Sequence, residues 1–267
     1  MHFRRIYAVI LRILYLMRGS VTRLVSPIVW PTLDIVLWGF ISKYMGTIAS
    51  PGFNFATAFL GAALLWEFFS RAAYGATMAF FEDVWSRNFL NLFASPITIV
   101  EYLTGLVLSG FLTAVIASAI MVMLAGAVFG LSYAAIGLLA VPCLIILYLF
   151  GIALGIIGIG IVLRWGPTAE WFIWPMPMVL APFAAVFYPV ATLPSWMQTV
   201  SSLLPASYVF ESLRAVIAGR PFSWFMLAIG AAIAVLDIVL ACWFFQRMYL
   251  RAVRTGLIAR YSAETFS

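Results

Sequence analysis

Long apolar stretches alternate with short polar ones along most of this chain, and the pattern predicts helices that cross a membrane. A hydrocarbon core about 30 Å thick requires about 20 apolar residues in a helix, because lipid offers the backbone no hydrogen-bond partners. Six stretches fit, at about residues 26–45, 55–80, 102–129, 134–163, 172–188 and 222–245. A very short turn at residues 130–132 joins the third and fourth. The sequence therefore predicts an all-α polytopic membrane protein with six transmembrane helices over residues 26–246.

The first 25 residues predict a helix of another kind. Its arginines occupy one arc at 100° per residue, and the opposite face is formed by Ile6, Ile10, Ile13, Met17 and Leu24. Such an amphipathic helix lies in the membrane interface, with its apolar face in lipid and its guanidinium groups among phosphates. We expect either a topology anchor or an element that transmits force, with a bend at Gly19–Ser20.

The segment between the second and third predicted spans has an apolar stripe of its own. The stripe follows helical spacing and consists of Trp85, Phe89, Leu92 and Phe93. The polar residues Arg87, Asn88 and Asn91 project the other way, and Pro96 ends the pattern. These features predict a short amphipathic helix over about residues 84–95. It either rests on the membrane surface or fits a groove on a partner.

Residues 187–218 are too polar and too rich in proline to span a membrane, yet too apolar for an ordinary loop. Pro189 and Pro194 break helices, and Glu211 can pair with Arg214 at i, i+3. We expect a re-entrant pair of half-helices on the outer face before the last span, with Trp196 at headgroup depth.

The composition agrees with a membrane protein, and the charges give it an orientation. Hydrophobic residues make up 65% of the chain, and the mean hydropathy is +1.10. With both termini inside, eleven of the 15 basic residues lie in cytoplasmic segments and three lie in outer ones. This bias places both termini in the cytoplasm, including a basic tail at residues 247–267. The net charge of +6 is concentrated at the chain ends, which favours anionic lipid headgroups over nucleic acid as its partner.

Three charged residues lie within the first two predicted spans. Glu67 and Arg71 are spaced i, i+4 and can pair along one helix, and Asp34 could reach Arg71 from the neighbouring helix. A buried charge is costly unless it is paired, so the cluster either locks the two helices together or serves as a proton relay or substrate contact.

The chain lacks the residues that most catalytic chemistry needs. Its single histidine is His2, which argues against His-based triads, zinc sites and haem ligation. Its single lysine, Lys43, is followed by Tyr44, whereas a nucleotide-binding P-loop needs Gly-Lys-Ser/Thr. We therefore expect no enzyme, no cofactor and no metal in this chain, and any ATP-driven work requires a separate ATPase chain.

These features together resemble the permease subunit of an ABC-2-type transporter, over the whole chain. The most specific stretch lies between residues 187 and 214, where the family's C-terminal signature is matched by Tyr188, Pro189, Leu193, Pro194, Trp196, Gln198, Leu204, Pro205, Tyr208, Glu211 and Arg214. The segment from Arg87 to Pro96 is similar to the family's coupling-helix region, although Arg87 stands where Gly is usual and Asn91 where Glu is usual.

The resemblance implies an exporter in the bacterial cytoplasmic (inner) membrane. Two copies of the chain would form the translocation path between them, above two copies of a cytosolic ABC ATPase that binds ATP and Mg. The ATPases would push on the coupling helix and the N-terminal helix. The outer half-helices would gate the exit. Polysaccharide, lipid, drug and small metabolite are all consistent cargoes.

Two alternatives stay open. A stand-alone secondary transporter or channel would use the Asp34, Glu67 and Arg71 cluster and would need no ATPase. A membrane-embedded enzyme, such as a lipid-modifying transferase, would need a catalytic constellation that the sequence does not show.

Overall fold

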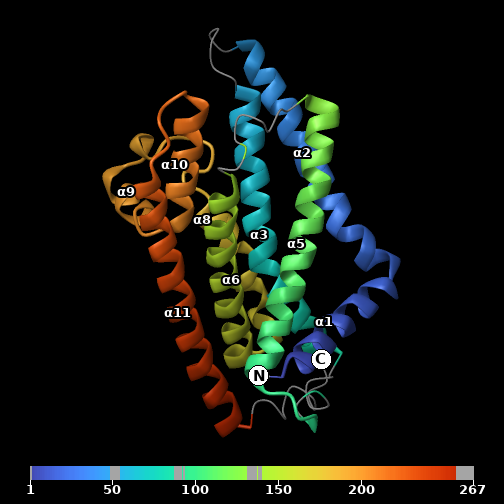
Figure 1. Cartoon of the computed structure of the whole chain (residues 1–267). Coiled ribbons are helices and arrows are strands. Elements are labelled where there is room, and N and C mark those ends of the chain that lie inside the picture. Colours follow the sequence, from blue (N-terminus) through green and yellow to red (C-terminus); the bar gives the residue numbers. More distant parts are fainter. Residues whose placement is uncertain are drawn as a thin grey trace.

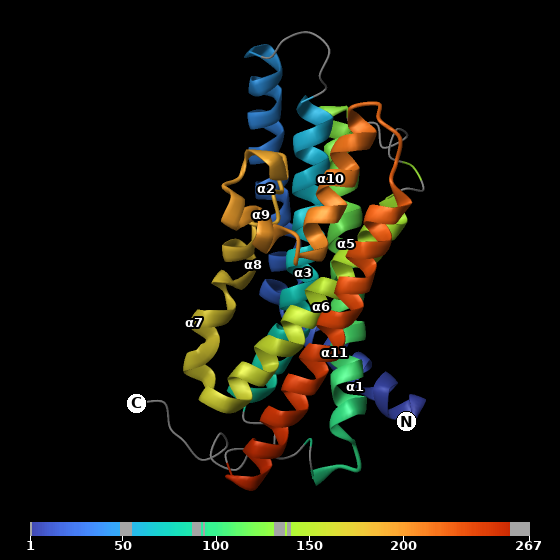
Figure 2. The same cartoon turned by 90° about the vertical axis from the view of Figure 1, so that its left-hand side faces the viewer.

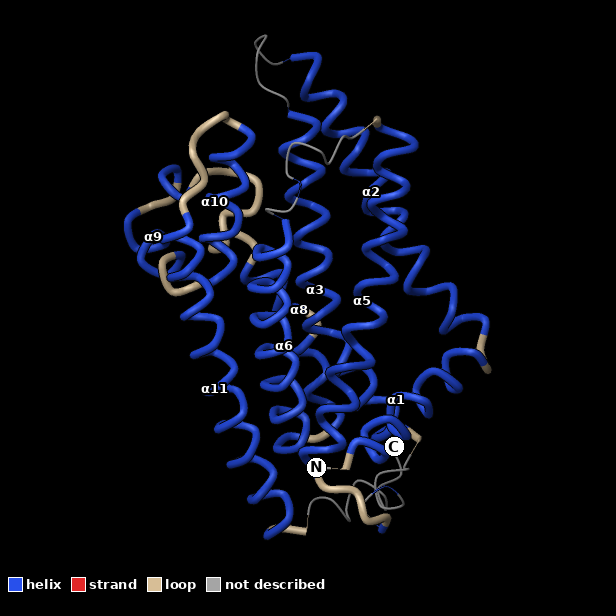
Figure 3. Tube along the Cα trace, viewed as in Figure 1, coloured by secondary structure: helices blue, strands red, loops and turns tan. Residues whose placement is uncertain are grey.

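The apolar runs of the sequence become long helices in the computed structural model of the chain, which describes residues 2–48, 55–86, 92, 94–130, 137 and 140–256 (Figure 1). The long helices are α1 (Phe3–Arg18), α2 (Val21–Ile48), α3 (Phe55–Trp85), α5 (Ile99–Phe129), α6 (Ala140–Trp165) and α11 (Trp224–Arg254). The shorter elements are η3 (Pro167–Ala169), α7 (Glu170–Ile173), α8 (Pro175–Leu180), η4 (Val190–Thr192), α9 (Ser195–Ser201) and α10 (Pro205–Ile217). In Figure 3 most of the described loop chain lies around α9 and α10.

Three helices in the described part of the chain, α5, α6 and α11, are long and apolar enough to cross a membrane. They coincide with the predicted third, fourth and sixth spans. The predicted first and second spans fall on α2 and α3, which have 28 and 31 residues. At 1.5 Å per residue these helices are about 42 and 46 Å long. The chain is thus a multi-pass membrane protein, and the count of six spans stays a prediction.

The predicted fifth span, residues 172–188, is not one continuous helix. It consists of α7, α8 and a run of turns, because Pro175 and Pro177 have no N–H to offer the carbonyls of Trp171 and Ile173. Trp174, between the two helices, nevertheless keeps helical backbone angles (φ −56°, ψ −44°). The two pieces therefore follow one another along the side of the bundle (Figure 2).

The predicted bend at Gly19–Ser20 is confirmed, because α1 ends at Arg18 and α2 begins at Val21. The boundary of the N-terminal helix therefore moves, and residues 21–25 belong to α2. At the other end of the chain, α11 continues to Arg254. The first residues of the predicted basic tail, residues 247–254, therefore extend the last helix, Thr255 caps it, and residues 257–267 lie outside the described residues.

The core forms where α3 meets α5 and α6, and small residues allow these helices to approach closely. A Cβ atom on Gly75 of α3 would lie 2.8 Å from the Cα of Gly110 in α5, and one on Gly151 of α6 would lie 2.6 Å from Ala72. Such contacts are typical of helix packing in membranes. In its most apolar stretch α6 is 67% buried, compared with 22% in both α5 and α11. α6 is therefore the central helix, and α5 and α11 present more of their surface to lipid.

The long helices have two distinct ends (Figures 1 and 2). The α1 end holds α1, the end of α3, the start of α5 and the ends of α6 and α11. The α10 end holds the end of α2, the end of α5 and the connection from α10 to α11. Charged side chains and polar contacts gather near both ends of the bundle.

Candidate functional site

At the α1 end, two ion pairs, Arg12–Asp83 and Arg5–Glu101, hold α1 on the long helices. We call these two pairs, together with Tyr102, the α1 clamp. Arg12 binds Asp83 of α3 with both guanidinium nitrogens, at 2.5 Å each. The hydroxyl of Tyr102 in α5 donates to the same carboxylate at 2.6 Å. Arg5 lies 3.4 Å from Glu101 of α5. Asp83, Glu101 and Tyr102 are each only 1% exposed, whereas the side chains of Arg12 and Arg5 are 24% and 33% exposed, so the carboxylate side of each contact is buried and the arginine side is partly open to solvent.

The carboxylate of Glu101 serves two helices at once. It accepts the backbone N–H of Thr98 at 3.0 Å and so completes a capping box at the start of α5. Its other oxygen accepts the backbone N–H of His2, the N-cap residue of α1, at 2.7 Å. These two hydrogen bonds tie the start of α5 to the start of α1.

Burial and the neighbouring negative charge shift the pKa of Arg12 in opposite directions. Burial alone would lower the pKa of its guanidinium, but the hydrogen bonds and the negative charge of Asp83 outweigh burial and raise that pKa. A bidentate arginine–carboxylate pair also fixes orientation, because two parallel hydrogen bonds define a plane. The pair therefore sets both the position and the angle of α1 on α3.

Apolar contacts also hold α1 against α5. Ile6, Val9 and Ile13 are buried, and a Cβ atom on Gly105 of α5 would lie 2.6 Å from Cγ1 of Val9. The absence of a side chain at Gly105 lets α1 lie directly on α5. The predicted lipid-facing stripe therefore packs partly against protein through Ile6 and Ile13.

The predicted environment of the N-terminal arginines was partly wrong. Arg5, Arg12 and Arg23 pair with Glu101, Asp83 and Glu82, rather than lying only among lipid phosphates. The Arg23–Glu82 pair joins the base of α2 to α3 at 3.2 Å and is much more exposed than the clamp. The prediction failed because the acidic partners are far away in sequence.

Between the two ends, the predicted charge cluster is only partly assembled. Glu67 and Arg71 pair along α3 at 2.9 Å, with each side chain about one fifth exposed. Asp34 of α2 has no ion pair within 4.0 Å among the described residues, and Arg71 attracts it over a longer distance. Tyr74, on the same face of α3, donates to the carbonyl of Trp174 at 2.6 Å. A further intramembrane carboxylate, Asp237 of α11, buries Oδ2 without a hydrogen-bond partner in the described part of the chain.

At the α10 end, Arg214 of α10 holds a non-helical segment in place. Its guanidinium donates to the carbonyl of Ala185 at 2.8 Å and pairs with Glu211 at 3.0 Å, as the i, i+3 spacing predicts. The same Glu211 oxygen accepts the backbone N–H of Val190 at 2.7 Å. Ala185 has a positive φ of 51°, a conformation that a side chain disfavours. The pair therefore stabilises a strained turn from both of its sides.

Aromatic and hydroxyl contacts tie this segment to the rest of the bundle. Phe187 stacks on Trp38 of α2, with ring centroids 4.5 Å apart, and lies 5.6 Å from Phe59 of α3. Tyr188 donates to the carbonyl of Pro182 at 2.8 Å. Trp196 is 62% exposed, with its ring 6.0 Å from Phe183.

Pro189 and Pro194 precede η4 and α9, in the extended conformations that end one helix and start the next. All six predicted outer residues therefore lie within a single connected segment, between α8 and the end of α10.

A family model for the ABC-2 type transporter matches residues 5–218, which is well over half of the chain. The chain belongs to the ABC-2 type transporter family. No curated protein matched it in a sequence search. The matched region runs from α1 through α10, so it contains both the α1 clamp and residues 181–217, between α8 and the end of α10, which we call the Arg214 segment. The chain is thus a permease subunit of an ABC-2 transporter, and permeases of this family typically work with an ATPase partner.

Only part of the predicted coupling helix of this ABC-2 permease can be placed. Trp85 is the last residue of α3 and stacks on Phe81 at 5.4 Å, so it does not begin a separate helix. Its side chain is 46% exposed at the α1 end. Leu92 is helical and packs partly against the main core. The other four predicted contacts, Arg87, Asn88, Phe89 and Phe93, lie outside the described residues.

Sequence reasoning missed the acidic half of the α1 clamp in this permease. One signal was present for Glu101, because Thr98-Ile-Val-Glu101 matches the Ser/Thr-x-x-Glu signature of a helix start. Nothing local marks Asp83 as the partner of Arg12, which lies 71 positions away. Within the described residues no group of three or more His, Cys, Asp or Glu side chains could hold a metal ion.

Proposed function

We propose that this permease is the membrane-spanning half of an ATP-driven exporter, with both termini in the cytoplasm of a bacterium and a separate ATPase below it. Family membership supports transport, and the charge asymmetry of the sequence supports the orientation. Two copies of the chain would enclose the path, with two copies of the ATPase, as the family resemblance implies.

The observation that carries the coupling proposal is the position of the α1 clamp around the segment of residues 86–98. Asp83 lies just before this segment and Glu101 lies just after it, and both are bound to α1. A push on the segment would therefore move α1 together with the ends of α3 and α5. Rigid, bidentate contacts transmit such a displacement better than flexible surface charges would.

Binding to the ATPase would use the apolar stripe of the same segment. Trp85, at the start of the stripe, and Leu92 are its described members, and Phe89 and Phe93 are its other members. Aromatic anchors usually dominate such interfaces, so Phe89→Ala or Trp85→Ala should each weaken association by about 2 kcal/mol or more. Arg87→Glu at the rim should change the salt dependence more than the affinity.

The test is copurification of the ATPase with the full chain, followed by measurement of its stimulated ATP hydrolysis. Trp224→Ala is a matched control, because Trp224 is also an exposed tryptophan but lies at the α10 end. The proposal expects loss of the ATPase from Trp85→Ala and Phe89→Ala, and full retention by Trp224→Ala. It fails if no ATPase copurifies with the wild-type chain, or if Phe89→Ala retains it as firmly as wild type.

The Arg214 segment would then act as the outer gate. Arg214 and Glu211 together fix the strained turn at Ala185, and Phe187 attaches that turn to α2 and α3. A helix movement that pulled Phe187 away from Trp38 would open the segment. Arg214→Glu should make vesicles leaky to small solutes, or uncouple ATP hydrolysis from transport, and tight vesicles with normal coupling would argue against a gate.

One observation favours the alternative of a secondary transporter. Asp34 has no ion pair among the described residues, although it lies within a predicted span, and unpaired intramembrane carboxylates often carry function. Asp34→Asn and Arg71→Ala separate the two proposals. If Asp34→Asn abolishes transport and wild type transports without any ATPase, the secondary transporter is correct. If Arg71→Ala lowers stability by about 3–5 kcal/mol and Asp34→Asn transports normally, the cluster is structural.

A further inference from the structure

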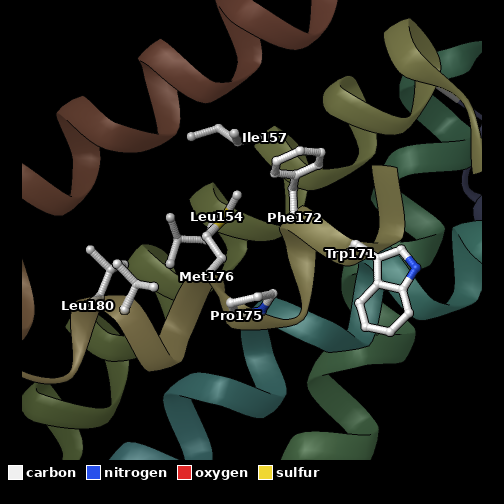
Figure 4. A pocket seen from close by; sticks show the side chains of 8 residues that line it. Leu154, Ile157, Trp171, Phe172, Pro175, Met176 and Leu180 are labelled. Atoms are coloured by element: carbon white, nitrogen blue, oxygen red, sulfur yellow. The ribbon is translucent and has the colours of Figure 1, made fainter. Parts of the chain in front are cut away.

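An apolar groove lies between α6 and the proline-interrupted helices α7 and α8, towards the α1 end of the bundle. Its cavity has a volume of about 430 Å³, and its lining is entirely apolar or aromatic. Figure 4 shows Leu154 and Ile157 of α6 on one side of the space, with Phe172, Met176 and Leu180 around it. Among the described residues, no charged, hydroxyl or amide side chain lines the groove.

The residues around the groove are exposed on the outside of the bundle. Trp171 and Phe172 are 83% and 74% exposed, at the end of the groove that is nearer to the α1 end. Trp165, at the end of α6, is exposed as well. Exposed tryptophans of this kind gather at the level of lipid headgroups. The groove therefore begins near the membrane surface and extends towards the middle of the bilayer.

A cation lies where the headgroup of a lipid in this groove would be. Arg164 is seven residues after Ile157, so it lies on the same face of α6 and about 10 Å further towards the α1 end. Arg164 is exposed and has no ion pair among the described residues, and its guanidinium lies 5.7 Å from the ring of Trp165. The carboxylate of Glu170 is not paired with it and instead accepts the indole N–H of Trp174 at 2.9 Å.

We propose that this groove binds one acyl chain of an anionic phospholipid from the leaflet at the α1 end, and that Arg164 holds the phosphate. The apolar lining takes the chain, and the guanidinium pairs with the headgroup at the distance that the helix sets. The charge asymmetry of the sequence assigns this leaflet to the cytoplasm, where anionic lipids attract arginine. A second copy of the chain in the same place would bury the unpaired Arg164, which is unfavourable without a carboxylate partner.

The proposal is tested by native mass spectrometry of the purified full chain, titrated with phosphatidylglycerol and, separately, with phosphatidylcholine of the same acyl chains. Ile157→Trp fills the groove, and Arg164→Gln removes the cation. Leu236→Trp on the exposed face of α11 and Arg220→Gln before α11 are matched controls for size and charge. Thermal unfolding of each variant checks that it is folded, and none of these measurements requires an ATPase, so the coupling proposal can fail independently.

The wild-type chain should retain one phosphatidylglycerol per chain. Ile157→Trp should weaken the binding of both lipids about tenfold or more, because even two excluded methylene groups cost that much. Arg164→Gln should weaken phosphatidylglycerol binding about fivefold and phosphatidylcholine binding less, because the choline cation offsets the charge of its phosphate. Inorganic phosphate should not compete.

Equal binding by Ile157→Trp and Leu236→Trp would overturn the proposal. Loss of a dimer in Ile157→Trp, with lipid binding unchanged, would also overturn it and would show that a second copy covers the groove.

Discussion

The two ends of this permease are held together by different means. At the α1 end, side chains of separate helices bind each other across long sequence distances, as in Arg12–Asp83 and Arg5–Glu101. At the α10 end, Arg214 and Glu211 of one helix bind the backbone of a neighbouring non-helical segment. The first arrangement fixes one rigid helix on two others. The second fixes the shape of a segment that has no regular backbone bonds of its own.

This difference separates the mechanical roles of the two ends. A side-chain pair between rigid helices transmits a displacement of either partner to the other. A side chain that binds backbone carbonyls instead substitutes for missing secondary structure, so its loss frees the segment without moving the helices. Mutations at the α1 end should therefore change the whole fold, and mutations at the α10 end should change local order.

The largest effect is expected from Asp83→Asn. This change leaves the partly buried Arg12 guanidinium without its counter-ion and weakens the hydrogen bond from Tyr102, at a carboxylate that is 1% exposed. Breaking one partner of a buried pair typically costs about 3–5 kcal/mol. Thermal or chemical unfolding of the purified protein should show a loss of this size. The triple variant Arg12→Met, Asp83→Leu and Tyr102→Phe is the control, because it removes both charges together with the hydroxyl that donates to Asp83, and it should recover most of the stability. A single Asp83→Asn variant as stable as wild type would mean that α1 is not held by the clamp.

Arg214→Lys should have the next largest effect, and the loss should be local. Lysine keeps the charge but cannot reach the Ala185 carbonyl and Glu211 with a planar fork. Loss of these hydrogen bonds should cost about 2 kcal/mol. Hydrogen–deuterium exchange should accelerate over residues 185–193, whereas exchange in α1 stays unchanged. Equal acceleration at both ends would contradict the distinction between them.

The elements of this fold that follow from local sequence were predictable. Long apolar runs indicated α5, α6 and α11, and the pairs Glu67–Arg71 and Glu211–Arg214 followed from helical spacing. Each of these depends on residues within a few turns of one another. The bend at Gly19–Ser20 was equally visible, because glycine and serine both favour helix ends.

The contacts between distant segments were not predictable in this way. The arc of arginines on α1 was visible, but the choice between lipid phosphate and Asp83 depends on how α1 lies on α3. The predicted fifth span is interrupted for a different reason, and its crossing of the membrane stays a prediction. Its apolar content indicated a helix, whereas Pro175 and Pro177 remove the hydrogen bonds that a continuous helix needs. The hydrogen bond from Arg214 to the Ala185 carbonyl depends on a turn in which Ala185 has a positive φ, and no local sequence signal marks that turn.

Gly105→Ala tests the apolar packing of α1 against α5. A Cβ atom at this position would lie 2.6 Å from Cγ1 of Val9, so α1 must shift away from α5. Overpacking of this kind costs about 1–3 kcal/mol, less than the loss of Asp83. Unfolding measurements on Gly105→Ala, and on Gly105→Ala with Val9→Ala, should show the loss and its recovery. Gly46→Ala is the matched control, because no atom lies within 4 Å of the Cβ position there. If Gly105→Ala is no less stable than Gly46→Ala, α1 does not lie directly on α5.

The smallest effect is expected at the exposed pair between Arg23 and Glu82, which lies at the α1 end like the clamp but joins α2 to α3 in contact with solvent. Arg23 is 42% exposed and Glu82 is 30% exposed, so water and salt compete for both charges. Exposed pairs contribute at most about 0.5–1 kcal/mol, and this contribution falls as salt is added. Arg23→Gln should therefore lower the unfolding temperature slightly at low ionic strength and not at all at high ionic strength. Asp83→Asn should remain destabilising at low and at high ionic strength, because the Asp83 carboxylate is only 1% exposed and salt cannot readily reach it. If Arg23→Gln were as damaging as Asp83→Asn at high salt, burial would not be what makes the α1 clamp strong.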